Sequence, residues 1–445
     1  MIRILHFSDI HFGQEVRGDW EPHDDVRREV VSDVRRMLSE KIVDGVADVI
    51  LVSGDIAQKG LEAEFKKAAS WLDLIKDAAC SSKVVVRTVP GNHDVNLSVL
   101  GLQGEILQKA IREMGNVEER YQSLGSLAAT GSQVFTKLDD YRSFASAHGS
   151  DFKSHAAPYY ESVFELPGGR SIRLCGLCSV MLSDRSDREG NMILGLNQYA
   201  IPRERNYIDI FMMHHPITWY SDRARAENYL NSRPKVIITG HEHSFRLSKV
   251  EREQDHEQLL IAAGALNPPH ASSSYNYSYN WIEITRVDDG SQNEVIEVRV
   301  YPRAWNESTT SFTSHQGITG LSKSFRLNCG RKIAVDPPLD VQAEVAERTP
   351  TAIKIEESPM DQDPNFERLT MLFWKRLSKE RRTDVLIRLG FLTEHARSRV
   401  PSSFERMALD TAREKGKLFE IWEALMEELP ASDREANPFL AGDQK

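Results

Sequence analysis

Residues 4–11 read Ile4-Leu5-His6-Phe7-Ser8-Asp9-Ile10-His11, an apolar run that ends abruptly in two metal-ligating residue types. Ile4, Leu5 and Phe7 are typical of a buried strand in a parallel sheet. Asp9 and His11 then lie at the carboxyl edge of that sheet, where α/β folds bind their ligands. The carboxylate and the imidazole can hold one metal ion, but a capping Asp beside a surface His is an equally good reading of the pair alone.

The composition is that of a soluble globular protein. Of 445 residues, 40% are hydrophobic and 27% are charged, which suggests two or three domains. The net charge of −10 gives no global basic field for nucleic acid, although a local basic channel is compatible with it. No apolar run approaches the roughly 18 residues of a membrane span, and the N-terminus lacks a signal pattern. We therefore expect a cytoplasmic protein without a membrane segment.

The four cysteines do not form a disulfide framework by number or spacing. Cys175 and Cys178 form a CxxC inside the apolar run from Ile172 to Val180, with no second pair to complete a zinc site. We expect both to be core cysteines on a strand, in preference to a redox or metal role.

Three apolar runs alternate with two helical patterns near the N-terminus. In order, these segments are residues 4–8, 26–43, 47–52, 62–77 and 84–89. A polar cluster follows each apolar run. This β-α-β-α-β order predicts an α/β fold with a parallel sheet and right-handed crossovers.

The pattern changes from about residue 96 to 154, where helical spacing predicts an insertion that could cover the carboxyl edge of the sheet. Further strands are predicted at residues 160–166, 172–177, 208–213 and 235–239. Shorter strands at 259–263, 281–285 and 295–301 are expected to form a second, more antiparallel sheet. Residues 306–365 form an extension and a proline-rich, acidic linker, and residues 366–445 are expected to fold as a small all-α domain.

Metal-ligating residue types stand at the ends of five of these apolar runs. They are Asp9 and His11, Asp55, Asn92 and His93, His214, and His241 and His243. Because the carboxyl ends of parallel strands share one edge, we expect these side chains to meet there. Any one cluster could be incidental, but five in one α/β pattern predict a metal site.

Five motifs carry a resemblance to the calcineurin-like metallophosphoesterase superfamily. They are Asp9-x-His11, Gly54-Asp55, Gly91-Asn92-His93-Asp94, His214-His215-Pro216 and Gly240-His241-x-His243. The resemblance implies a four-layer α/β/β/α sandwich over residues 1–305 that holds two divalent metal ions. Asp9, His11 and His243 would hold one ion, Asn92, His214 and His241 the other, and Asp55 would bridge them. Nitrogen and oxygen ligands without sulfur suit Mn, our first choice, and also Fe or Zn.

The resemblance also assigns catalytic roles. His93 is in the position that contacts the phosphate and helps the leaving oxygen depart, and Asp94 could orient it. His215 is open between a substrate or supporting role and plain packing. Gln58 and Lys59 stand where the Ser/Thr phosphatase branch has Asp and Arg, which argues against a protein phosphatase. A solvated Lys59 is favoured over a phosphate contact.

The predicted function is that of a metal-dependent phosphodiesterase acting on nucleotides or nucleic acid. The motifs resemble bacterial cyclic-nucleotide phosphodiesterases, and the opening from Asp9 to Gly13 is similar to that of DNA-repair nuclease subunits. His214-His215-Pro216 fits the first group better. The alternatives are a DNA or RNA nuclease effector of a bacterial defence system, a phosphomonoesterase, and an inactive scaffold. Residues 267–280 could stack a base or sugar at the site mouth or form a plain loop.

Residues 366–430 resemble the small helical effector-associated domains of bacterial conflict systems. The likeness lies in an amphipathic opening helix, in Arg388-Leu389-Gly390 and in residues 412–418. It implies a protein partner that recruits the enzyme. A dimerisation or packing appendage is the alternative.

Overall fold

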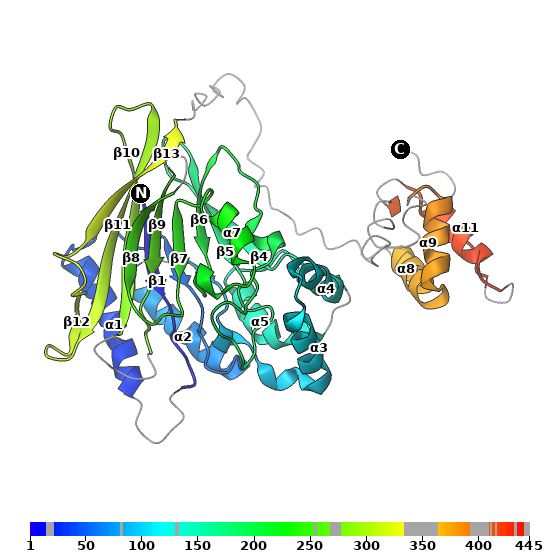
Figure 1. The fold of residues 1–445 in the computed structure, drawn as a ribbon, viewed down its shortest axis with the longest axis horizontal. Helices are drawn as coiled ribbons and strands as arrows, with labels where there is room; N and C mark the ends of the chain where they lie inside the picture. Colours follow the sequence, from blue (N-terminus) through cyan, green and yellow to red (C-terminus); the bar gives the residue numbers. More distant parts are fainter. Residues whose placement is uncertain are drawn as a thin grey trace, which may run out of the picture. The chain divides into compact units, whose positions relative to one another are not determined.

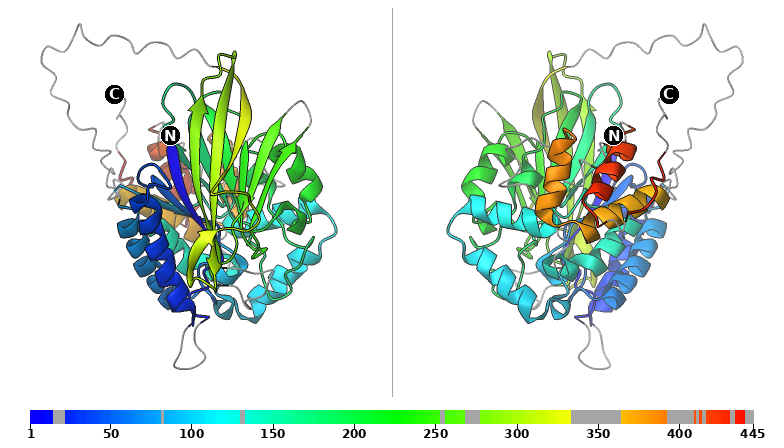
Figure 2. Two further views of the ribbon diagram at one scale, coloured as in Figure 1. Left: turned by 90° about the vertical axis from the view of Figure 1, so that its left-hand side faces the viewer. Right: turned by 90° about the vertical axis from the view of Figure 1, so that its right-hand side faces the viewer.

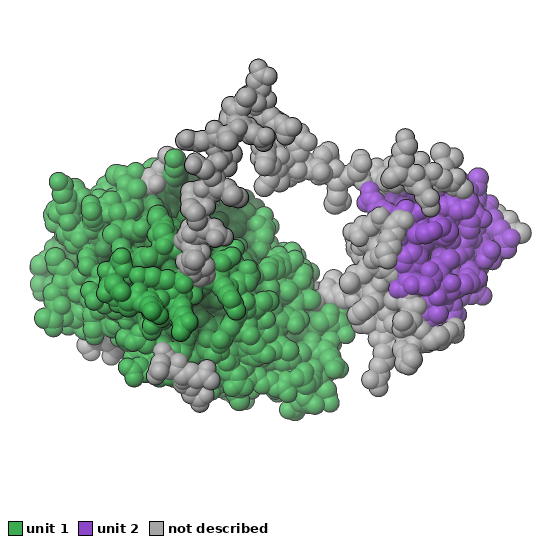
Figure 3. Space-filling model, turned by 90° about the horizontal axis from the view of Figure 1, so that it is seen from above, with its two compact units in different colours: residues 1–335 green, residues 336–445 purple. Residues whose placement is uncertain are grey.

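The computed structural model describes residues 1–14, 22–80, 83–129, 133–252, 256–267, 277–332, 364–391, 409, 412–413, 416–430 and 434–439. The chain divides into two compact units, Met1–Val335 and Asp336–Lys445, which Figure 3 colours separately. Among the described residues, no helix combines the length and the apolar character needed to cross a membrane.

Two β-sheets form the centre of the first unit (Figure 1). The first sheet has the order β12-β11-β10-β1-β2-β3, with β13 also paired to β11, and the second has the order β4-β5-β6-β7-β9-β8. The first sheet contains β1 (Ile2–Phe7), β2 (Val49–Val52), β3 (Val85–Thr88), β10 (Ser278–Val287), β11 (Asn293–Asn306), β12 (Ser311–Ser314) and β13 (Lys323–Arg331). The second contains β4 (Tyr159–Phe164), β5 (Ser171–Leu177), β6 (Tyr207–Met212), β7 (Val236–Thr239), β8 (Arg246–Glu251) and β9 (Glu257–Ala262).

Helices connect these strands. They are α1 (Pro22–Ser39), α2 (Glu62–Ala78), α3 (Gly101–Glu113), α4 (Val117–Ala129), α5 (Asp139–Ala147), α6 (Leu196–Tyr199) and α7 (Arg223–Leu230). The 3-10 turns are η1 (Asn92–Asp94), η2 (Leu97–Val99), η3 (Gln133–Leu138) and η4 (Ile217–Trp219). The start of α2 shows how local sequence sets an element, because the Glu64 carboxylate accepts a hydrogen bond from the Leu61 backbone N–H at 3.1 Å.

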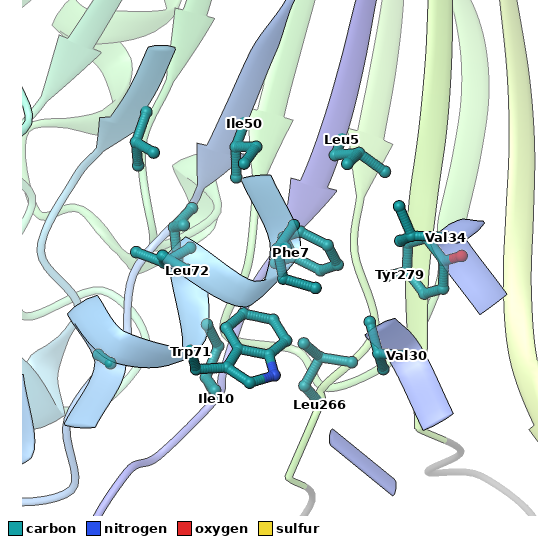
Figure 4. Packing of buried hydrophobic residues seen from close by; sticks show 14 of the residues in the cluster. Leu5, Phe7, Ile10, Val30, Val34, Ile50, Trp71, Leu72, Leu266 and Tyr279 are labelled. Atoms are coloured by element: carbon teal, nitrogen blue, oxygen red, sulfur yellow. The ribbon is translucent and has the colours of Figure 1, made fainter. Parts of the chain in front are cut away.

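One face of the first sheet packs against α1 and α2. Side chains alternate along a strand, so Leu5 and Phe7 of β1 point to this face, where Figure 4 shows them among Val30, Leu72 and Trp71. The rings of Phe7 and Trp71 meet edge to face with centroids 5.3 Å apart. In the left view of Figure 2, the blue helices α1 and α2 lie along one side of the strands.

The opposite faces of the two sheets pack together. Ile2 and Ile4 of β1 join Ile210 of β6 in a core between the sheets. Phe211, the next residue of β6, points to the outer face and packs in a third core with residues of α6 and α7. Helices, two sheets and helices therefore form four layers, which confirms the predicted α/β/β/α sandwich.

The predicted grouping of the later strands is wrong. We expected β9, β10 and β11 to form a separate antiparallel sheet. Instead β10 pairs antiparallel with β1 in the first sheet, and β9 pairs parallel with β7 in the second. Apolar alternation identifies a strand and its buried face, but it does not identify the strand's neighbour.

The first sheet also continues beyond residue 305. β12 and β13 both pair with β11, and the compact unit extends to Val335. Residues 96–154 carry α3, α4, η3 and α5, in agreement with a helical insertion. Residues 333–363 of the expected extension and linker lie outside the described residues.

The second unit is a small helical bundle, as predicted. Its helices include α8 (Pro364–Arg376), α9 (Lys379–Arg388) and α11 (Leu418–Glu427). Phe373, Leu386 and Trp422, one from each helix, are buried in a common core. α9 begins at Ser378, whose side chain accepts a hydrogen bond from the Arg381 N–H at 3.4 Å.

His6 is a buried histidine on β1. Its Nε2 lies 2.9 Å from the Ser53 hydroxyl, and its Nδ1 lies 3.4 Å from the Asn280 side-chain amide. Burial lowers the pKa of His6 to about 3, against the opposing effect of Asp9. The folded chain therefore holds this ring neutral at pH values where an unfolded chain protonates it.

We expect His6 to weaken the fold as the pH falls. The unfolded histidine has a pKa near 6.5, so only the unfolded state takes up this proton between pH 6.5 and about 3. Between pH 6.5 and 5.0 this costs about 2 kcal/mol of unfolding free energy. His6→Gln should remove that part of the pH dependence, as measured by urea unfolding followed by tryptophan fluorescence. Equal pH dependence in both proteins would contradict a neutral buried His6.

Candidate metal centre

The backbone turns left-handed at most of the predicted ligands. Asp9 has φ 53°, His11 50°, Asp55 52°, His241 67° and His243 53°. Only three other non-glycine residues in the described part of the chain have positive φ, namely Lys41, Cys80 and Thr310. Such conformations cost about 1–3 kcal/mol each and persist where surrounding structure fixes them, often at functional sites.

Hydrogen bonds between the loops after β1 and β2 fix these turns. The N–H of Asp9 donates to the Gly54 carbonyl at 3.0 Å, and the N–H of His11 donates to the Asp55 carbonyl at 3.0 Å. Gly54 has φ +101°, and a Cβ there would lie 2.5 Å from Nδ1 of His214. Only glycine therefore lets the β2 loop approach the end of β6 so closely.

Two groups of ligand-type side chains result. The first is Asp9, His11, Asp55 and His243, and the second is His214, His215 and His241; in each, the ligand atoms lie within 4.8 Å of one another. Within the first group, His243 Nε2 lies 3.2 Å from Asp9 Oδ1.

Asp55 joins the two groups. Its Oδ2 lies 3.8 Å from Nε2 of His11 and 3.3 Å from Nε2 of His214. Its Oδ1 accepts a hydrogen bond from the His93 N–H at 2.8 Å. One buried carboxylate thus contacts residues from the ends of β1, β3 and β6.

Hydrogen bonds select the ring nitrogens that can bind a cation. His214 Nδ1 lies 2.8 Å from the Ser53 carbonyl oxygen, which only accepts, so Nδ1 carries a proton. When this ring is neutral, the lone pair is on Nε2, which faces Asp55. Nδ1 of His11 and Nδ1 of His241 are buried and have no hydrogen-bond partner among the described residues. Buried orphan nitrogens are costly, and divalent ions would satisfy them, so the residues present fit metal binding.

The electrostatics also favour cations. Burial alone would raise the pKa of Asp9. The hydrogen bond with His243 and the charges of His214 and His243 together outweigh burial, and they bring this pKa down to about 2. Burial also acts to raise the pKa of Asp55, but the charge of His214 and its hydrogen bond act in the opposite direction. The resulting pKa of Asp55 is well below its usual value. For His214, burial lowers the pKa and Asp55 more than compensates, raising it to about 9. Both carboxylates are therefore ionised and offset by histidine protons that a metal ion would displace.

His93 lies beside the first group. Its ring meets that of His11 edge to face, with centroids 4.8 Å apart. Nδ1 of His93 lies 3.0 Å from the Gln58 carbonyl oxygen, so it donates its proton there. Nε2 is the nitrogen left to exchange a proton with another molecule.

Asp94 takes a different place from the one expected. Its carboxylate accepts hydrogen bonds from the Ala57 N–H at 2.7 Å and the Gly91 N–H at 2.8 Å. Burial, together with Asp55, raises the pKa of Asp94 to about 7. The structure thus uses Asp94 to join the loops after β2 and β3, and the Gln58 carbonyl, in place of Asp94, orients the His93 ring.

His215 supports Asn92. Nε2 of His215 lies 3.1 Å from Oδ1 of Asn92, and its Nδ1 lies 2.8 Å from the Ser179 hydroxyl. Burial, followed by repulsion from His214, lowers the pKa of His215 well below the usual value, so the ring is neutral. The hydrogen bond with His215 therefore links the Asn92 side chain to the second group.

Trp219 is a residue that the sequence motifs did not single out. Its ring lies 4.1 Å from that of His241 and 5.3 Å from that of His215, measured between centroids. It is only partly buried. The one available signal was its position four residues after His215 in the same loop.

The remaining candidates are placed as follows. Lys59 is exposed, in agreement with a solvated side chain. Cys175 and Cys178 are buried and form no disulfide, which confirms the prediction of core cysteines, although only Cys175 lies on a strand and Cys178 follows the end of β5. Asn267 is buried, and its N–H donates to the Asp9 carbonyl at 3.0 Å. Residues 268–276 of the expected site-mouth stretch lie outside the described residues.

Two parts of the chain match known protein families. Residues 2–245 match calcineurin-like phosphoesterase, and residues 365–427 match the GTPase-associated adaptor domain. None of the curated proteins matches the chain.

The solved structures that the chain resembles include the following two. A 5'-nucleotidase precursor from Thermus thermophilus has 11% identity and a TM-score of 0.34, over 74% of this chain and 54% of that one. The chain thus spans about half the length of that protein. A Thermotoga maritima protein has 12% identity and a TM-score of 0.22, over 68% of this chain and 99% of the other.

The first family match spans more than half of the 445 residues and ends just after His243. It therefore contains all five motifs and both groups of ligand-type side chains. The chain belongs to the calcineurin-like phosphoesterase family, a family of metal-dependent phosphoric ester hydrolases.

Proposed function

We propose that the protein hydrolyses phosphodiesters of nucleotides or nucleic acid, using two divalent metal ions. The position of the buried Asp55 carboxylate between two groups of ligand-type residues carries this proposal. Bound ions would supply Lewis acidity and lower the pKa of water. In this proposal, Asp9, His11 and His243 hold one ion, Asn92, His214 and His241 hold the other, and Asp55 contacts both. Manganese is the proposed metal, with iron and zinc compatible with the same ligands.

His93 is the proposed proton donor to the leaving oxygen. The Gln58 carbonyl holds the proton on Nδ1, so Nε2 gains and loses a second proton without turning the ring. The N–H of His93 also bonds to Asp55, which ties the ring to the metal ligands. Asp94 contributes indirectly, because its carboxylate fixes the backbone on both sides of this contact.

Two features support a nucleotide substrate in preference to a phosphoprotein. Trp219, partly exposed beside His241 and His215, offers a flat aromatic surface for a base. Gln58 and Lys59 replace the acidic and basic residues expected of a protein phosphatase. The net charge of −10 favours a short nucleotide ligand over a long duplex.

We further propose that residues 366–430 bind a protein partner that recruits the enzyme. The match of residues 365–427 to an adaptor domain supports this role. The domain has its own core around Phe373, Leu386 and Trp422, so it can present a defined surface. A role as an effector in bacterial defence is compatible with this arrangement.

Replacing Asp55 tests the metal proposal. Asp55→Asn keeps the shape of the side chain but removes the charge that faces both groups. We expect loss of bound metal, measured by mass spectrometry, and a fall in Mn-dependent hydrolysis of bis(p-nitrophenyl) phosphate by more than about 100-fold. Asp73→Asn, an exposed position on α2 paired with Lys76, is the matched control and should have no effect.

Retained turnover in Asp55→Asn would refute the proposed metal centre. The wild-type assay repeated with cyclic AMP and with AMP separates the two ester classes. A diester rate at least ten times the monoester rate is expected. The reverse order would make the protein a phosphomonoesterase.

His93 is tested through the leaving group. His93→Gln should slow cyclic AMP hydrolysis by about 10²–10⁴-fold, because an alkoxide needs a proton to leave. The loss should be much smaller with bis(p-nitrophenyl) phosphate, because nitrophenolate leaves without one. Metal content should be unchanged. Equal losses on both substrates would show that His93 acts on binding or on the metal site, and not as the acid.

The recruitment proposal is tested by shortening the chain. Protein ending at Lys332 should hydrolyse bis(p-nitrophenyl) phosphate at the full-length rate but lose the partners that full-length protein captures from its host. Light scattering on both proteins gives the oligomeric mass. Unchanged partners would contradict the proposal, and a change from a dimeric to a monomeric mass with unchanged partners would favour the dimerisation alternative.

A further inference from the structure

A second cavity lies at the opposite edge of the second sheet from the metal centre. It has a volume of about 470 Å³ and is formed where the chain enters β5, β6, β7 and β9. The metal ligands His214 and His241 follow the other ends of β6 and β7. Lys235 lies six residues before His241, and Tyr207 lies seven residues before His214, so the two sites are roughly 20 Å apart along the extended chain.

Positive charge dominates this cavity. Arg170, Arg203, Arg205, Arg233 and Lys235 line it, and the lining carboxylates are Glu204 and Asp209. Arg173 already holds both of these acids. Its Nη1 lies 2.8 Å from Glu204 and its Nε lies 2.7 Å from Asp209. Arg170 shares the buried Glu294 carboxylate, 3.5 Å from its Nε, with Arg286. The other four lining cations form no ion pair with a carboxylate among the described residues.

Neutral groups hold several of these cations in place. Arg203 donates to the Ser232 carbonyl at 2.8 Å, and Arg170 donates to the Arg331 carbonyl at 2.8 Å. Lys235 Nζ lies 3.1 Å from Nδ1 of His256. Such neutral partners fix the geometry of Arg203 and Lys235 but leave the charge of these two side chains uncompensated.

Arg233 shows the deficit most clearly. Its guanidinium lies over the Tyr229 ring, 4.5 Å from the centroid. Its Nη1 is buried and has no hydrogen-bond partner among the described residues. Burial, followed by repulsion from Arg203, lowers the pKa of Arg233, and burial also lowers that of Lys235, where Arg170 and Arg203 add repulsion. A buried donor without an acceptor and several mutually repelling cations are what a bound anion would relieve.

We propose that this cavity binds a small phosphate compound of several negative charges, such as a nucleoside polyphosphate. Arginine guanidinium groups match phosphate oxygens in pairs, and several occur here around one concave surface. The volume is that of a small-molecule site. The charge is local, because the chain as a whole carries −10, so the cavity selects anions by position and not by bulk attraction.

Tripolyphosphate binding tests the site. Full-length Asp55→Asn protein, in which the metal centre is disabled, is titrated with sodium tripolyphosphate by calorimetry at two salt concentrations. We expect one binding event that weakens with salt. Arg205→Gln combined with Arg233→Gln should weaken it at least tenfold. Arg185→Gln combined with Arg188→Gln, the same charge change in the 182–191 loop, should leave it unchanged. Parallel titrations with ATP and with inorganic phosphate show whether a nucleoside or the phosphate chain alone is recognised.

Each outcome decides the proposal. Absence of binding to the Asp55→Asn protein, or equal weakening by both arginine pairs, would overturn it. Arg203→Glu, at an exposed position, is a second variant that keeps the core intact and should abolish binding. In the wild-type background, Arg205→Gln should hydrolyse bis(p-nitrophenyl) phosphate at the normal rate. This result would separate the cavity from the metal centre.

Discussion

Two ionised carboxylates, Asp9 and Asp55, are buried at the centre of the larger unit, and much of the local structure serves to hold them there. Removing a carboxylate from water costs several kcal/mol unless opposite charge or hydrogen bonds replace the water. His243 and His214 lie 3.2 and 3.3 Å from Asp9 and Asp55. These histidines come from the ends of strands in the second sheet, whereas the acids come from the first. The acids therefore link the carboxyl edges of the two sheets.

The close approach of the two carboxyl edges explains why the backbone is strained at the proposed metal ligands. It also explains why glycine residues stand beside them. A Cβ at Gly240 would lie 2.0 Å from the Ser8 hydroxyl, and one at Gly91 would lie 2.1 Å from Oδ1 of Asp55. Without these glycines the loops after β1, β2, β3 and β7 could not approach closely enough to share charges. The left-handed turns at Asp9 and Asp55 carry a local cost that the packing of the sandwich offsets.

The ends of the apolar runs were sufficient to predict an α/β fold with a parallel sheet and the residues to consider for the site. The four-layer sandwich was predicted from the resemblance of five motifs to a known family. Asp9 and His214 are far apart in the chain, but each follows a buried parallel strand, so the fold rule brings them to one edge. Strand pairing was beyond reach, since β9 and β10 carry similar apolar patterns and join different sheets. The position of Trp219 depends on how η4 folds back on the ligands, and no spacing rule encodes that contact.

The two edges of the second sheet hold charge in opposite ways. At the carboxyl edge, Asp9 and Asp55 supply negative charge, which would repel a phosphate unless bound cations offset it. At the amino edge, Arg173 neutralises the two lining acids, and Arg203, held by the Ser232 carbonyl, forms no ion pair among the described residues. The carboxyl edge therefore suits chemistry on a phosphoester, because the cations that would polarise it there are the proposed metal ions. The cations of the amino edge are instead fixed side chains of the protein, which suits the anion binding proposed for that cavity.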